Sequence, residues 1–65
     1  MTLSEFGAQV RKDRLAKGLS LYKAAVLARV HPNSVMLCER GATSKAMAER
    51  ISRALQAVPA SEAGR

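Results

Sequence analysis

Four residues that interrupt helices, Gly18, Pro32, Gly41 and Pro59, divide this chain into short segments. Within each segment the apolar side chains recur every three or four positions, which is the period of an amphipathic helix. Glycine readily adopts the left-handed conformation that ends a helix, and proline is tolerated in the first turn of a helix but not in its interior. This spacing predicts an all-α fold, with four short helices packed into one compact domain over residues 1–58.

The expected helix starts carry capping residues. Thr2 and Glu5 have the spacing of a capping box, and Ser20 precedes the second segment as its N-cap. His31 takes the N-cap position of the third segment, with Pro32 in the first turn. We expect helices over residues 3–17, 21–28, 32–40 and 44 or 45–58. Residues 59–65, with the sequence PASEAGR, are expected to form a disordered C-terminal tail.

The apolar stripe of each segment indicates which side chains it buries. The expected core residues are Leu3, Phe6 and Val10, then Leu21, Ala24, Ala25 and Ala28, and finally Met47, Ile51, Ala54, Leu55 and Val58. The alanines of the second segment favour the close approach of another helix. Cys38 falls on the same face as Val35 and is expected to act as a small buried apolar side chain.

Length and residue types argue against an enzyme. A chain of 65 residues forms one small domain and can hardly enclose the roughly 300 Å³ that a substrate or cofactor cavity needs. The sequence offers no Ser–His–Asp set, no carboxylate pair expected to share a cleft and no glycine-rich phosphate loop. His31 and Cys38 are the single histidine and cysteine, too few for a four-ligand zinc site. We therefore expect no catalysis, cofactor, metal site or small-molecule substrate.

Net charge and hydropathy limit the choice of partner. Lys and Arg number 11 against 5 Asp and Glu, and the resulting charge of +6 favours nucleic acid first and an anionic membrane surface second. No segment has about 18 consecutive apolar residues, and none combines a broad apolar face with a lysine-rich one. A membrane is therefore not an expected partner. A lone cysteine is typical of a reducing cytoplasm.

The second and third segments are joined by a short connection. Only about three residues, 28–30, remain between them, and alanines lie where the two helices would cross. Two short helices joined in this way predict a helix-turn-helix. The second helix of such a pair enters the DNA major groove with its N-terminal residues leading.

The residues around this pair resemble those of a known family. Gly18, Leu19, Ser20, Ala25 and Val30 form the pattern GLS…A……V, followed by ERG at residues 39–41 and ISRAL at residues 51–55. Over roughly residues 6–55 the chain resembles the lambdoid phage repressor and Cro type of helix-turn-helix protein, also called the xenobiotic-response-element (XRE) type. The resemblance implies a four-helix domain of the lambda-repressor-like type.

The resemblance also implies two sets of DNA contacts. The residues that contact base edges would be Pro32, Asn33 and Leu37, with His31 at the margin. The residues that contact phosphates would be Ser20, Leu21 through its amide, Arg40, Thr43, Ser44 and Lys45. Asn33 alone can make a bidentate contact to adenine, whereas Pro32 and Leu37 can only touch thymine methyl groups. Base readout is therefore expected to be sparse and to favour A·T pairs.

Two further positions are interpreted through the resemblance. Family members often pair an arginine late in the first helix with the glutamate that closes the third, which implies an internal ion pair between Arg14 and Glu39. The alternative is that these residues are two independent surface charges. Arg29 stands where the family usually has glycine, so the turn is either strained or built with a different geometry.

Several apolar side chains fall outside the expected core. Tyr22, Val26 and Leu27 lie on the outer side of the second segment, where they either cover a very small core or form a dimer or partner surface. Met36 and Leu37 make the face of the third segment that should meet DNA more apolar than a base-reading helix usually is.

These observations support one principal hypothesis and two alternatives. The principal hypothesis is a sequence-preferring double-stranded DNA-binding transcriptional regulator, a Cro-like or repressor-like protein of a phage or prokaryote. It would act in the cytoplasm, at the bacterial nucleoid or in a phage-infected host, as a monomer or as a homodimer on DNA, with the helix over residues 32–40 in the major groove. The alternatives are an architectural or recombination-directing DNA-binding protein, and a protein-interaction module of the antitoxin or antirepressor kind.

Overall fold

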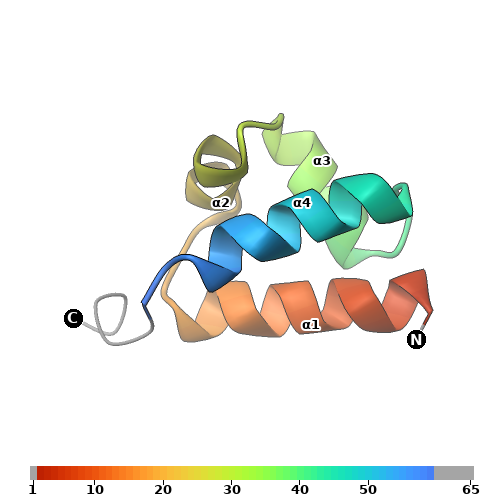
Figure 1. Cartoon of the computed structure of the whole chain (residues 1–65), viewed down its shortest axis with the longest axis horizontal. Helices are drawn as coiled ribbons and strands as arrows, with labels where there is room; N and C mark the ends of the chain where they lie inside the picture. The colour runs from red at the N-terminus through yellow and green to blue at the C-terminus, as the bar shows by residue number, and fades with distance from the viewer. Residues whose placement is uncertain (1, 60–65) are drawn as a thin grey trace.

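The computed structural model describes residues 2–59, and these residues form four helices and no strand. The helices are α1 (Leu3–Ala16), α2 (Leu21–Ala28), α3 (Pro32–Glu39) and α4 (Lys45–Gln56). α1 packs against α3 and α4, and α2 packs against the same two helices. Figure 1 shows α1 along the bottom, α2 and α3 at the top and α4 across the middle. This confirms the expected all-α domain of four helices. The tail that was expected to be disordered lies, from residue 60 onward, outside the described residues.

Each helix begins at a side chain that caps it. At α1 the N–H of Glu5 donates to Thr2 Oγ1 (3.1 Å) and the N–H of Thr2 donates to Glu5 Oε1 (2.9 Å), which completes the capping box. These hydrogen bonds, that of the Thr2 backbone first, lower the pKa of the Glu5 carboxyl. Ser20 Oγ, His31 Nδ1 and Ser44 Oγ accept backbone N–H groups at the starts of α2, α3 and α4. The caps expected at Thr2, Ser20 and His31 are confirmed, and the cap at Ser44 is an addition to them; all four depend only on nearby residues.

Three helices end earlier than the sequence predicts. α1 ends at Ala16 rather than residue 17, α3 at Glu39 rather than residue 40, and α4 at Gln56 rather than residue 58. Gly18 (φ 67°) and Gly41 (φ 73°) adopt the left-handed conformation shortly after α1 and α3, as expected. At α4 the N–H of Val58 bonds to the carbonyl of Leu55, three residues back, which tightens the chain into a turn before Pro59.

The core is small and aliphatic. Its buried residues are Val10, Ala24, Ala25, Ala28, Val35, Cys38, Ala48, Ile51 and Leu55. Ala48 was not among the expected core residues, and Leu3, which was, remains 36% exposed in the first turn of α1. Val58 is half-buried but lies beyond the end of α4. Phe6, Leu21, Met47 and Ala54 are half-buried against the core.

Two glycines allow α1 to contact the C-terminal end of α3 closely. A Cβ atom on Gly7 would lie 2.1 Å from the carbonyl oxygen of Cys38, so only glycine fits at this position of α1. A Cβ atom on Gly41 would lie 2.7 Å from the Cα atom of Ser4. These contacts hold the end of α3 against the first half of α1 and thereby fix which side of α3 faces solvent.

Lys17 ties the end of α1 to the end of α4. It is only 8% exposed, and its Nζ donates to the carbonyl of Leu55 and lies 3.3 Å from Asp13 Oδ1. The carbonyl groups of a helix's last turn attract cations, so Lys17, the C-cap residue of α1, also stabilises the end of α4.

None of the helices among residues 2–59 has the length and apolar character needed to cross a bilayer.

Candidate nucleic-acid interface

The inner face of α3 is anchored in the core. Val35 is fully buried and Cys38 is 1% exposed. Burial, and secondarily the nearby charge of Glu39, raises the pKa of the Cys38 thiol, which makes it a poor nucleophile. Among residues 2–59, no three His, Cys, Asp or Glu side chains gather closely enough to bind a metal ion. The burial of Cys38 beside Val35 in the core confirms that it packs α3 as a small apolar side chain.

Arg14 and Glu39 form a bidentate ion pair, as the family resemblance implies. Arg14 Nε lies 2.6 Å from Glu39 Oε2, and Nη2 lies 3.2 Å from Oε1. The third donor, Nη1, bonds to the carbonyl of Leu19 at 2.8 Å, in the segment that leads into α2. The two side chains are 10% and 8% exposed. One buried guanidinium thus joins the end of α3 to the start of α2, and the Glu39 carboxylate faces inward.

The opposite side of α3 faces solvent. Asn33 is exposed and Leu37 is 37% exposed, one helical turn apart, and both lie away from Val35. His31 is exposed at the N-cap, whereas Pro32 is half-buried in the first turn. The structure therefore presents three of the four expected base-contacting side chains to solvent and Pro32 only in part.

Met36 is half-buried beside this exposed face, at the position next to Leu37. Together the two side chains give α3 an apolar surface between Asn33 and Arg40, as the sequence suggests. This surface suits thymine methyl groups better than the polar edges of bases.

The residues expected at phosphates lie at two helix starts and in one loop. Ser20 and Ser44 cap α2 and α4, and their Oγ atoms already accept backbone N–H groups, so each hydroxyl can still donate. Leu21 occupies the first position of α2, where a backbone N–H has no partner within the helix. Arg40 and Lys45 are exposed at the end of α3 and the start of α4, and Thr43 is half-buried between them.

Arg29 adopts the left-handed conformation in the connection between α2 and α3. Its φ and ψ are 58° and 46°, and the N–H of Val30 bonds to the carbonyl of Ala25, which closes α2. Of the two possibilities left open by the sequence, the strained one is found: a residue with a Cβ in this region costs about 1–2 kcal/mol. The connection comprises residues 29–31, one position later than expected.

The half of the chain that contains α2 and α3 exposes no acidic side chain. Between Ser20 and Ala48 the only acidic residue is Glu39, whose side chain is 8% exposed against Arg14. The cations Lys23, Arg29, Arg40 and Lys45 of the same stretch are all exposed.

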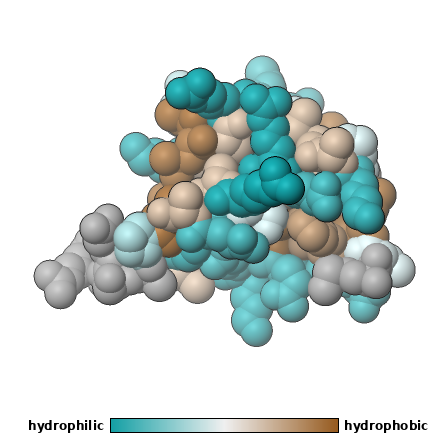
Figure 2. Space-filling view, in the orientation of Figure 1, coloured by the Kyte–Doolittle hydropathy of each residue, from teal (hydrophilic) through white to brown (hydrophobic). Residues whose placement is uncertain are grey.

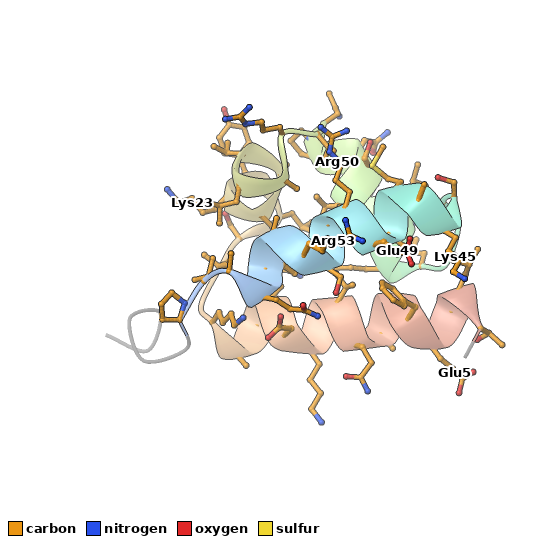
Figure 3. The ribbon with its side chains drawn as sticks, viewed as in Figure 1. Glu5, Lys23, Lys45, Glu49, Arg50 and Arg53 are labelled. Atoms are coloured by element: carbon orange, nitrogen blue, oxygen red, sulfur yellow. The ribbon has the colours of Figure 1, made fainter. Side chains whose placement is uncertain are left out.

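The outer face of α4 also carries cations, namely Lys45, Arg50 and Arg53, but Glu49 lies among them (Figure 3). Its potential is therefore less uniformly positive than that of the α2–α3 half.

A groove of about 500 Å³ lies between α1 and α4. It is lined by Phe6 and Val10 from one helix and by Ser52 and Gln56 from the other, with small Ala16 at one end. Its volume exceeds the roughly 300 Å³ of the smallest ligand pockets, and it is partly open to solvent.

Sequence reasoning missed Gly7, Lys17 and Lys23 as residues of structural or functional interest. A glycine inside a helix costs about 1 kcal/mol relative to alanine, so Gly7 could have signalled close packing. Lys17 follows Asp13 by four residues, which predicts their pairing but not the bond to Leu55.

Comparison with protein-family models, with curated proteins and with solved structures finds no match to this chain.

Proposed function

We propose that this protein is a sequence-preferring double-stranded DNA-binding regulator, in which α2 and α3 form a helix-turn-helix of the lambda-repressor-like type and α3 enters the major groove. The proposal combines the family resemblance of residues 6–55 with the geometry of α3. It describes a transcriptional regulator of a phage or prokaryote that acts in the cytoplasm and needs no cofactor.

The observation that carries the proposal is the charge distribution around an anchored α3. Val35 and Cys38 hold one side of the helix in the core, and Arg14 turns the Glu39 carboxylate inward. The segment between Ser20 and Ala48 therefore meets solvent with cations and neutral side chains only. A surface of this kind attracts the phosphate backbone and presents no carboxylate to repel it.

In this arrangement each exposed residue has a distinct role. Asn33 reads adenine through its side-chain amide, and Leu37 contacts thymine methyl groups. Arg40 and Lys45 neutralise phosphates, which adds affinity but little sequence discrimination. The amide of Leu21 meets a further phosphate at the positive end of the α2 dipole. Specificity then depends on few base contacts, and DNA shape supplies part of it.

Selection of bound duplexes from a random library, followed by affinity measurements at two salt concentrations, tests the proposal. We expect an A·T-rich consensus and at least a 10³-fold preference, on the order of the usual specificity ratio, for the consensus over a scrambled duplex. Half-sites spaced by about 10 bp would identify a homodimer on DNA. A ratio near one with a steep salt dependence would instead favour an architectural protein.

Two variants assign the roles on the selected duplex. Asn33→Ala is expected to lower affinity for the consensus by about 1–3 kcal/mol and to relax preference at one A·T position. Arg40→Ala should weaken consensus and scrambled duplexes equally and reduce the salt slope by about one. Lys12→Ala, which removes an exposed cation of α1, is the matched control and should leave preference unchanged. Equal behaviour of all three variants would contradict the assignment of α3 to the groove.

A further inference from the structure

The outer face of α2 is apolar and exposed. Tyr22 is 70% exposed, Val26 55% and Leu27 40%, so one eight-residue helix carries three of the six large apolar side chains that are exposed among residues 2–59. Figure 2 shows this hydrophobic area at the upper left, over α2. Ala24, Ala25 and Ala28 form the buried side of α2, and none of the three large side chains belongs to the core or to the half-buried residues packed against it.

Lys23 lies within this apolar area. Successive residues of a helix are rotated by about 100°, which places Lys23 between the row of Tyr22 and Val26 and the position of Leu27. Its side chain points away from α4 (Figure 3). We call Tyr22, Lys23, Val26 and Leu27 the α2 outer patch. It combines two apolar flanks with one central ammonium group.

Among residues 2–59, no carboxylate is placed to pair with Lys23. α2 contains no acidic residue, and Glu5, Asp13 and Glu39 bond to Thr2, Lys17 and Arg14. Glu49 lies near Lys45, toward the N-terminal end of α4, on the opposite side of the view from Lys23 of α2 (Figure 3). Arg29, exposed just beyond the end of α2, adds a second positive charge near the patch.

A second copy of this chain is a poor occupant of the patch. A twofold interface places the same surface on both sides, so two α2 outer patches would bring two Lys23 ammonium groups together, and α2 itself supplies no acidic residue between them. The patch is also small, since an eight-residue helix is about 12 Å long whereas each partner of a standard interface buries about 800 Å². The charge and the size both favour a short acidic segment.

We propose that the α2 outer patch binds an amphipathic helical segment of an acidic partner protein. Apolar side chains of that segment, spaced by three and four residues, pack against Tyr22, Val26 and Leu27, and a carboxylate bonds to Lys23. The patch lies on the outer face of α2 rather than on the exposed face of α3, although Tyr22 and Lys23 are close to the start of α2 that we propose to meet DNA. The test below uses no DNA, so this inference can fail while the proposed DNA binding holds.

A displayed library of helical peptides tests this inference with the full chain as bait. Every peptide has a fixed apolar stripe, and Glu, Gln or Lys is randomised beside it. We expect selection to enrich Glu at these positions. A synthesised winner should shift the backbone amide resonances of α2 in ¹⁵N-labelled protein and leave those of the α1 face around Lys12 unchanged.

Two variants separate the apolar and the electrostatic contributions. Lys23→Glu and Val26→Ser should each weaken the selected peptide at least about tenfold, and both replace exposed residues, so folding is preserved and is checked by circular dichroism. Lys12→Glu makes the same change in net charge on α1 and should alter affinity by less than about twofold, because exposed charges more than about 10 Å apart are screened by salt.

Several results would overturn the inference. Enrichment of Lys, enrichment without any charge preference, or no enrichment above the starting library would show that an acidic segment is not the occupant. Binding that survives both Lys23→Glu and Val26→Ser would place the peptide elsewhere. Self-association of the free protein with line broadening confined to α2 would show that the patch binds a second copy instead.

Discussion

The helices α4 and α2 pack against each other but use large and small side chains in opposite ways. α4 buries Ile51 and Leu55 completely and exposes charged residues, as an amphipathic helix usually does. α2 buries Ala24, Ala25 and Ala28 and exposes Tyr22, Val26 and Leu27.

This difference separates two tasks within one small domain. Complete burial of a leucine or isoleucine side chain is worth about 1.5–3 kcal/mol, and an alanine contributes far less. α4 therefore supplies much of the free energy of folding, whereas the alanines of α2 let it lie close to α4 and α3. Leu21 packs against the core, whereas Tyr22, Val26 and Leu27 of α2 remain available for other contacts.

The largest expected effect follows from removing Leu55, which is fully buried in α4. Leu55→Ala should lower the free energy of unfolding by about 3 kcal/mol, through lost burial and the cavity left behind. Leu27→Ala makes the same change at a side chain of α2 that is 40% exposed, and should cost less than about 1 kcal/mol. Urea unfolding measures both. Equal losses would contradict the division between the two helices.

The second largest loss of stability is expected from a larger side chain at the buried alanines of α2, where the helix packs closely on its neighbours. Ala24 is fully buried, so Ala24→Leu forces its neighbours apart and should destabilise the protein by about 1–3 kcal/mol. The control is Ala46→Leu at an exposed position of α4, where the change should stay within about 0.5 kcal/mol. If the Ala24 variant is as stable as its control, α2 does not depend on a close approach.

A smaller effect is expected at Lys17, which bonds to the end of α4, than at the core residues, and a still smaller one at Lys23, which lies on the exposed face of α2. Lys17→Met removes the cation that bonds to the carbonyl of Leu55, and should cost about 1 kcal/mol of unfolding free energy because that carbonyl also accepts from Val58. Lys23→Met, on the exposed face of α2, should be neutral within about 0.5 kcal/mol. A neutral Lys17→Met would show that this bond does not support the end of α4.

The smallest effect concerns the helix starts. The lowered pKa of Glu5 means that its contribution is present above the ordinary pKa of glutamate, about 4.3, and is lost as the pH falls through the lower folded-state value. We expect the Cα chemical shifts of residues 3–5 to lose helical character in acid, whereas the serine-capped starts of α2 and α4 do not respond. Glu5→Gln should abolish the pH dependence. A response at all three starts would indicate general acid unfolding.

Local features of this fold could be predicted from the sequence, and features set by distant residues could not. The caps at Thr2, Ser20 and His31 follow from residues within one turn, so the helix starts were predictable. The helix ends were less predictable because turns such as the one that ends at Val58 compete with the last helical bonds. Burial of Ala48 and the bond from Lys17 to Leu55 depend on which helices meet, and no periodicity encodes that.

The candidate site divides in the same way. The exposure of Asn33 and Leu37 follows from their position opposite Val35 on the third helix, and the sequence predicts it. The pairing of Arg14 with Glu39 joins residues far apart in the chain and was suggested by family resemblance alone. The left-handed conformation of Arg29 was one of two open alternatives, because its side chain does not reveal how the turn is built.

The most direct test of the central proposal is amide chemical-shift mapping of ¹⁵N-labelled protein with the selected duplex. We expect the largest shifts at residues 20–22, at the start of α2, and at residues 31–41, which comprise α3 and its two flanks. Largest shifts around Arg50 and Arg53, with α3 unchanged, would place DNA on the outer face of α4 and contradict the proposed helix-turn-helix mode of binding.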